Sequence, residues 1–216
     1  MTFTIIEQTD PDRGQAEETV RAAFARQYGA SVGEFAPTLV ALRPGRGDIH
    51  RETWNRETWH GETLGGISCV AGIRFATDGF FSERYLDQPI ETLLRPLWNA
   101  PVRREHIAEV TNLAGMKPRS SQILIAYVIH LCRQRSIQWA FFTAGERLRA
   151  ALRRAGILTL DLGPALPERM DNPDAWGTYY ATNPHVVAIH DSMVAMRGIP
   201  ARDERTPPLL KDSALA

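Results

Sequence analysis

Cysteine is scarce in this 216-residue chain, which has two, Cys69 and Cys132, each within an apolar run. Two isolated cysteines do not provide a disulfide framework, and neither has the neighbours that a metal site needs at ligand spacing. We therefore expect two buried, reduced thiols in a cytoplasmic protein, with no metal site and no tightly bound cofactor.

Long apolar segments and an excess of charge of either sign are also absent. The first residues, MTFTIIEQTD, lack the basic and apolar regions of a secretion signal, and the longest uncharged apolar run, around residues 120–132, is too short to span a bilayer. Lys and Arg together number 25, as do Asp and Glu, so net charge gives no general argument for nucleic acid or an anionic membrane. We expect a cytoplasmic protein without membrane contact.

The motifs of several enzyme classes are missing. The sequence has no G-x-x-x-x-G-K-[ST], no G-x-G-x-x-G after a strand, no G-x-S-x-G and no H-E-x-x-H. P-loop nucleotide hydrolysis, dinucleotide redox chemistry, serine hydrolysis and zinc proteolysis therefore have no support.

The clearest pattern lies between residues 107 and 162, which we interpret as a βαβαβ unit. Ser120 or Ser121 is placed to cap the first helix, and Thr143 to Glu146 match the capping box that opens a second one. Short crossovers that contain helices predict parallel neighbouring strands. The expected strands are residues 107–113, 137–143 and 157–162, and the expected helices are residues 122–135 and the segment that Gly156 ends.

The sequence as a whole predicts one domain over residues 1–190, followed by a poorly ordered tail over residues 191–216. Strands at 37–43 and 64–76 are expected to form an antiparallel hairpin. The insertion between them carries Arg-Glu-Thr-Trp twice, at 51–54 and 56–59. It is either a solvated hairpin tip whose tryptophans pack on the domain, or a loop that covers a substrate or docks a large partner.

Four segments resemble the thermostable haemolysin family in the same order and at similar spacing. They are FFSERYLDQPIE, EVTNLAG, TAGERLRAALRRAGI and WGTYYATNPHVVA, and the resemblance extends from about Pro37 to His190. That family is similar to the GCN5-related N-acetyltransferase (GNAT) fold and to acyl-homoserine lactone synthases. The resemblance implies an α/β fold with a mixed, splayed β-sheet flanked by helices, and an acyl donor in the split after the strand 107–113.

The resemblance also implies a donor-binding loop, in which backbone amides at a helix N-terminus hold the pyrophosphate of coenzyme A. The family pattern Q/R-x-x-G-x-G/A corresponds here to residues 119–124, which keep the basic start and lack both small residues. Side chains at those positions restrict how closely a pyrophosphate approaches the backbone. The expected donor-binding residues are Asn112, Leu113, Lys117, Arg119, Ser120, Ser121 and Gln122.

Three residues are candidates for the chemistry, and each has a structural alternative. Glu109 is the preferred base or amine anchor, or else a carboxylate paired with an arginine such as Arg74 or Arg104. Glu83 orients the acceptor amine or is displayed at the surface, and Tyr180 protonates the leaving group or is packed with its hydroxyl bonded. Period two places Glu109 and Asn112 on opposite faces unless the strand bulges, and Asn112 has the alternative of satisfying backbone groups.

The predicted function is a GNAT-like acyltransferase of specialised metabolism that forms an amide between an activated acyl group and an amine of a small molecule. The first alternative keeps the chemistry and takes the acyl group from an acyl-carrier protein or an aminoacyl-tRNA instead of an acyl-CoA. It is motivated by the altered loop and by the many arginines around the βαβαβ unit. The second alternative is a non-catalytic GNAT-shaped binding protein.

Overall fold

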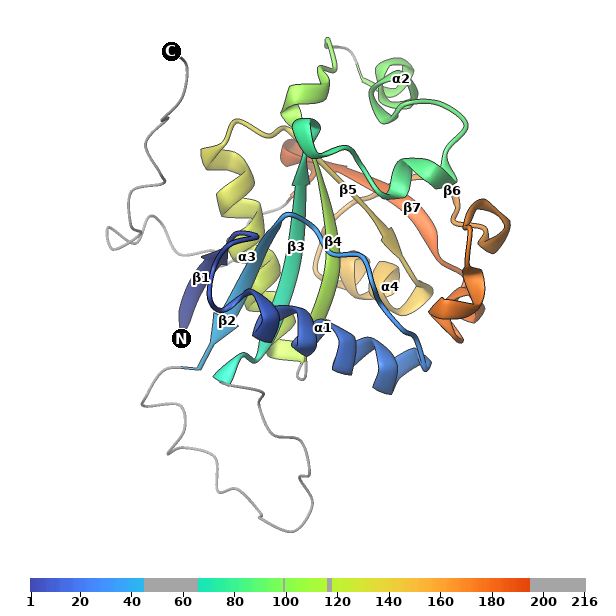
Figure 1. Cartoon of the computed structure of the whole chain (residues 1–216). Coiled ribbons are helices and arrows are strands. Elements are labelled where there is room, and N and C mark those ends of the chain that lie inside the picture. Colours follow the sequence, from blue (N-terminus) through green and yellow to red (C-terminus); the bar gives the residue numbers. More distant parts are fainter. Residues whose placement is uncertain (45–65, 99, 116–117, 195–216) are drawn as a thin grey trace.

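A computed structural model describes residues 1–44, 66–98, 100–115 and 118–194, without the side chains of residues 118 and 119. Over this part of the chain the expected mixed α/β fold is confirmed. A single seven-stranded sheet has the order β1-β2-β3-β4-β5-β7-β6 (Figure 1). The strands are β1 (Thr2–Ile6), β2 (Thr38–Arg43), β3 (Cys69–Phe75), β4 (Ile107–Gly115), β5 (Trp139–Ala144), β6 (Leu160–Pro164) and β7 (His185–His190), and the α-helices are α1 (Arg13–Tyr28), α2 (Ile90–Leu94), α3 (Pro118–Gln134) and α4 (Glu146–Arg154).

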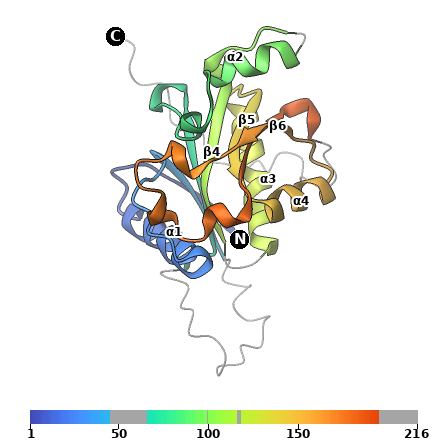
Figure 2. The ribbon, with the colours of Figure 1, turned by 90° about the vertical axis from the view of Figure 1, so that its right-hand side faces the viewer.

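Helices cover both faces of the sheet, as Figure 2 shows with α1 on one side and α3 and α4 on the other. Ala16, Val20 and Ala23 of α1 are buried in a core with β2 and β3, and Gly29 ends this helix in the left-handed conformation, with φ of 66°. The opposite core is formed by α3 and the other face of β2 and β3. The many apolar residues of α3 are explained by this position against the sheet.

The antiparallel half of the sheet follows the sequence-based expectations closely. β2 and β3 form the expected antiparallel hairpin, in which Leu42 lies opposite Cys69. The insertion that joins them, with its Arg-Glu-Thr-Trp repeat, lies outside the described residues. Both cysteines are free and buried, as expected.

The βαβαβ interpretation is wrong in the placement of its last strand. β4 and β5 are parallel neighbours, but β7 pairs antiparallel with both β5 and β6 and so separates them. The periodicity of a βαβ segment fixes the direction of its strands and does not exclude a later strand from inserting between them. Residues 191–193 form a 3₁₀ turn, and Val194 bridges to Ile157, so these first residues of the expected tail belong to the folded unit.

Both expected helix caps are also corrected. α3 begins at Pro118, so Ser120 and Ser121 lie inside its first turn; proline suits the first position because its missing N–H would have no helical partner. The N-cap of α4 is Gly145 without a side-chain hydrogen bond, and Thr143 remains in β5. Among the described helices none has the length and apolarity to cross a membrane.

Candidate active site

The parallel strands β4 and β5 separate partway along their length. Their register covers Ile107 to Glu109 on β4 and Trp139 to Phe141 on β5, whereas both strands continue beyond these residues. The space between their diverging ends is the split expected from the family resemblance. Backbone groups in such a split have no neighbouring strand and face whatever occupies it.

A β-bulge in β4 lies at the edge of this split. Val70 and Gly72 of β3 are two residues apart, but their partners on β4, Ala114 and Thr111, are three apart. Asn112 lies in the extra position with φ of 51°, a left-handed conformation that asparagine tolerates better than most residues. The bulge that was required to bring Glu109 and Asn112 to one face is therefore present.

The side chain of Asn112 holds a segment of loop before β2. Its Oδ1 accepts a hydrogen bond from the backbone N of Ala36 at 3.0 Å, and its Nδ2 donates to the carbonyl of Glu34 at 3.3 Å. Asn112 therefore satisfies backbone groups, which is the structural alternative given for it above. Asn112 also lines the cavity described next.

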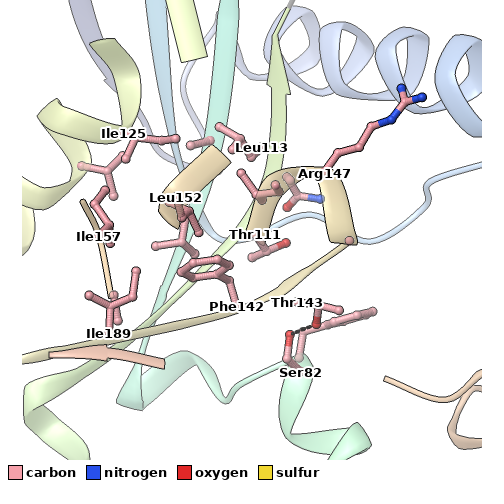
Figure 3. A pocket seen from close by; sticks show the side chains of 18 of the residues that line it. Ser82, Thr111, Leu113, Ile125, Phe142, Thr143, Arg147, Leu152, Ile157 and Ile189 are labelled. Atoms are coloured by element: carbon pink, nitrogen blue, oxygen red, sulfur yellow. Dashed lines mark hydrogen bonds between the residues drawn. The ribbon is translucent and has the colours of Figure 1, made fainter. Parts of the chain in front are cut away.

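A cavity of about 650 Å³ passes through the split and extends over both faces of the sheet. On one face its lining is apolar and comes from the side of the sheet that α3 and α4 cover (Figure 3). Phe142 and Ile189 point there from β5 and β7, in a small cluster with Leu148, Leu152 and Ile157. The residues that face this half include Ile125, Ile129, Phe142, Leu152, Ile157 and Ile189.

On the other face the lining carries hydroxyl groups and aromatic rings. Strand alternation turns Thr143 away from its neighbour Phe142, toward the 3₁₀ turn Ser82–Tyr85. Thr143 Oγ1 lies 2.9 Å from Ser82 Oγ, which is drawn as a dashed line in Figure 3. The other residues of this half include Thr111, Tyr85, Tyr28, Phe81, Trp176 and Tyr179.

Glu109 is fully buried beneath this polar half and is held by the 3₁₀ turn Ser82–Tyr85. Its Oε1 accepts hydrogen bonds from Ser82 N at 2.8 Å and Ser82 Oγ at 2.6 Å, and its Oε2 accepts from Phe81 N at 2.5 Å. Burial raises the pKa of Glu109, against the lowering effect of the Ser82 and Phe81 hydrogen bonds and the charge of Arg74. Hydrogen bonds through Ser82 Oγ and then Thr143 Oγ1 link the carboxylate to the cavity.

Neither arginine named as an alternative partner of Glu109 forms an ion pair with it. Arg74 Nη2 donates to Glu34 at 2.8 Å, although Arg74 lies directly opposite Glu109 in the β3–β4 register. Arg104 Nη1 and Nη2 donate to the two carboxylate oxygens of Glu83 at 2.6 and 2.7 Å. Glu83 also accepts from the backbone N of Ile90 at 3.0 Å, at the start of α2.

These contacts place Glu83 outside the cavity lining, in a position that ties the Ser82–Tyr85 turn to α2. Burial of Glu83 disfavours its charge, but the hydrogen bonds from Arg104 and Ile90 outweigh burial and lower its pKa. A carboxylate that already accepts a bidentate arginine has little capacity left to orient an amine.

Tyr179 and Tyr180 lie in a 3₁₀ turn, Tyr179–Thr182, that precedes β7. The dipeptide Asn183-Pro184 follows directly, and Asn183 adopts a left-handed conformation that ends the turn. Tyr180 Oη lies 2.8 Å from Tyr85 Oη, and Tyr85 lines the cavity. Burial raises the pKa of both hydroxyls, so both stay protonated at neutral pH.

The expected donor-binding residues are not brought together by the described structure. Asn112 and Leu113 line the cavity, whereas Ser120, Ser121 and Gln122 do not. Ser120 is buried, and Ser121 Oγ lies 3.8 Å from the sulfur of Cys69. Lys117 and the side chain of Arg119 lie outside the described residues.

Sequence reasoning missed the hydroxyls of Ser82 and Thr143 as members of the site. Thr143 was assigned to a helix cap, and Ser82 lies in the family-like segment FFSERYLD, where Glu83 attracted the functional interpretation. A signal was present in each case, since both are small polar residues next to large apolar ones. Only the tertiary fold places the 3₁₀ turn of Ser82 against the end of β5.

The splayed mixed sheet with a cavity through the split is the GNAT-like fold of acyl-transferring enzymes. The chain belongs to the family described as Thermostable hemolysin, whose family model matches residues 6–194. A search of curated proteins found no match.

Solved structures with the same fold include acyl-homoserine lactone synthases and an N-acyl amino acid synthase. LasI, an AHL synthase, has a TM-score of 0.56 at 12% identity, over 94% of this chain and 98% of that chain. BjaI, a CoA-dependent acyl-homoserine lactone synthase solved with SAM and isopentyl-CoA, has a TM-score of 0.51 at 13% identity, over 89% and 85%. FeeM, an N-acyl amino acid synthase from uncultured soil microbes, has a TM-score of 0.50 at 14% identity, over 89% and 96%. At these identities the likeness is one of fold.

Proposed function

We propose that this protein is an N-acyltransferase that forms an amide between an activated acyl group and an amine of a small molecule. The observation that carries the proposal is the cavity through the β4–β5 split, which is apolar on one face of the sheet and lined by hydroxyls and aromatic rings on the other. Two substrates entering from opposite faces meet at the split. Direct attack of the amine on the acyl carbonyl then needs no covalent enzyme intermediate.

Glu109 accepts the amine proton in this proposal, and it acts through two hydroxyls. The amine nitrogen forms its bond to the carbonyl carbon and passes its proton to Thr143 Oγ1. The hydroxyl proton of Thr143 then moves to Ser82 Oγ, and the hydroxyl proton of Ser82 moves to Glu109 Oε1. The distances of 2.9 Å between the hydroxyls and 2.6 Å from Ser82 to the carboxylate support this relay. Burial that raises the pKa of Glu109 makes it a better proton acceptor near neutral pH.

The departing thiolate or alkoxide takes a proton from the Tyr85–Tyr180 pair, and the pair regains a proton from solvent after Glu109 has released the amine proton to solvent. Tyr180 keeps the role given to it from the sequence, and it acts through Tyr85, the member of the pair that lines the cavity. Both hydroxyls are protonated at neutral pH because burial raises their pKa values. Glu83 contributes by holding the Ser82–Tyr85 turn through Arg104, and it does not contact the amine.

The donor is an acyl-CoA, an acyl-carrier protein or an aminoacyl-tRNA, and the first two share the pantetheine arm. The tRNA alternative has less support, because several arginines around the unit have protein partners. Arg133 pairs with Asp191, and Arg149 donates to the carbonyl of Asn183 and lies near Asp161. Pantetheine thioesters are therefore the first donors to test.

The test is to incubate the protein with an amine pool and, in parallel, acyl-CoA, acyl-carrier protein and charged tRNA, and to follow discharge of each donor. We expect amine-dependent discharge of a thioester. Thr143→Val keeps the shape of the side chain and removes the hydroxyl, so we expect turnover to fall at least about tenfold, with recovery in Thr143→Ser. If no donor is discharged, the protein is a GNAT-shaped binding protein and the proposal is rejected.

A further inference from the structure

The apolar half of the cavity is lined by large side chains from both helices and both strands around it. Its lining comes from four elements: Ile125 and Ile129 of α3, Phe142 of β5, Leu152 of α4 and Ile189 of β7. We call this part of the cavity the chain compartment. Pockets of a few hundred Å³ with such a lining are typical of sites for apolar small molecules.

The chain compartment lies between two separate cores. Leu124, Val128 and Leu131 of α3 pack with β2 and β3, whereas Leu152 of α4 packs with Ile157 and Ile189. Side chains of both cores line the space between them, so its wall is apolar on both sides. An apolar space of this kind binds apolar ligands better than it binds water.

An ion pair bounds the compartment where α3 ends. Arg133 and Asp191 line the cavity there, and Arg133 Nε donates to Asp191 Oδ1 at 2.5 Å, so the two charges are paired with each other. Cys132 also lines this region, and burial raises the pKa of its thiol to about 12. The thiol is therefore neutral and acts as part of the apolar wall.

The chain compartment is continuous with the proposed reaction position. Phe142 and Thr143 are consecutive in β5 and point to opposite faces, so an acyl carbonyl beside Thr143 has its alkyl chain directed along Phe142. Figure 3 shows Phe142, Leu152, Ile157 and Ile189 together on one side, and Thr143 with Ser82 on the other.

We infer that the chain compartment binds the alkyl chain of the donor, and that the transferred group is a fatty acyl group longer than acetyl. The inference rests on the proposed function, because it names the acyl substrate of the same site. Each methylene buried in such a compartment raises donor affinity about fourfold until the compartment is full.

The experiment measures binding of S-acyl-pantetheines with chains of two to twelve carbons by titration calorimetry, with no amine present. Acyl-pantetheine is the part shared by acyl-CoA and acyl-carrier protein, so it tests the compartment whichever carrier delivers the chain. Ile125→Trp places a larger side chain in the compartment. Gln134→Trp is the matched control, because Gln134 is exposed on the same helix and does not line the cavity.

In the wild type and in Gln134→Trp we expect affinity to rise with chain length and then level off. In Ile125→Trp we expect short chains to bind as before and the increase to stop several carbons earlier. Equal affinities along the series in the wild type, or a series unchanged by Ile125→Trp, would overturn the inference. Binding that follows chain length without any amine-dependent discharge would reject the proposed function and leave the compartment assignment standing.

Discussion

Among single residues, Glu109 and its link to the cavity matter most for the proposed chemistry. Glu109→Gln removes the proton acceptor, so we expect turnover per folded molecule to fall at least about tenfold. A glutamine also places an NH₂ group near the N–H donors of Phe81 and Ser82, so we expect a loss of stability of about 1–3 kcal/mol in urea titrations. Unchanged turnover per folded molecule would remove Glu109 from the mechanism.

Ser82→Ala separates these two effects, because it keeps both backbone donors to Glu109 and interrupts the relay. The same relay predicts a pH profile. Glu109 accepts a proton only when ionised, and burial raises its pKa above the ordinary 4.5, so the acid limb of turnover lies above that value. An acid limb at or below 4.5 is the result that would contradict the relay.

Glu83 is predicted to act on stability and not on chemistry. Its pKa is lowered from 4.5 in the folded protein, so its contribution is present above 4.5 and is lost as pH falls through the lower folded value. Glu83→Gln should therefore lower the urea midpoint at neutral pH, with the difference from wild type shrinking in acid. Glu91→Gln is the control, since it removes one contact to Arg104 and keeps the bidentate pair. A Glu83→Gln protein that keeps wild-type stability but loses turnover would restore a direct catalytic role.

At the element scale, the bulge in β4 sets the geometry of the split. Asn112 combines a left-handed backbone with two hydrogen bonds to the loop before β2, and alanine supports neither. Asn112→Gly relieves the backbone strain, so we expect it to be less destabilising than Asn112→Ala by about 1 kcal/mol. Urea titration of both variants measures this difference. Equal losses of unfolding free energy in the two variants would show that only the hydrogen bonds contribute. An Asn112→Ala protein as stable as wild type would contradict the role given to Asn112 in the bulge.

The elements that sequence predicted well are those with strong local signals. The bulge at Asn112 is a condition that the sequence sets without predicting it, whereas the hairpin of β2 and β3 followed from local patterns. The position of β7 between β5 and β6 did not, because pairing partners distant in sequence leave no periodic signal. The start of α3 was misplaced because a serine cap was favoured over a proline at the first helical position.

At the scale of the whole molecule, the family resemblance predicted the splayed sheet and located the split. Whether Glu109, Glu83 and Tyr180 are linked to the cavity depends on which side chains the fold brings together, and that information is tertiary. A buried carboxylate reached through Ser82 and Thr143 joins three segments that lie far apart in the sequence. Periodicity gives the face of a strand on which a residue lies, but not the loop that packs against it.

The most direct measurement is a crystal structure of the protein with a medium-chain S-acyl-pantetheine. We predict that the thioester carbonyl lies in the β4–β5 split beside Thr143, with the alkyl chain between α3 and α4 against Phe142 and Leu152, and the hydroxyl-lined half open to an amine. A thioester bound elsewhere, with the split unoccupied, would contradict the claim that acyl transfer takes place between these strands.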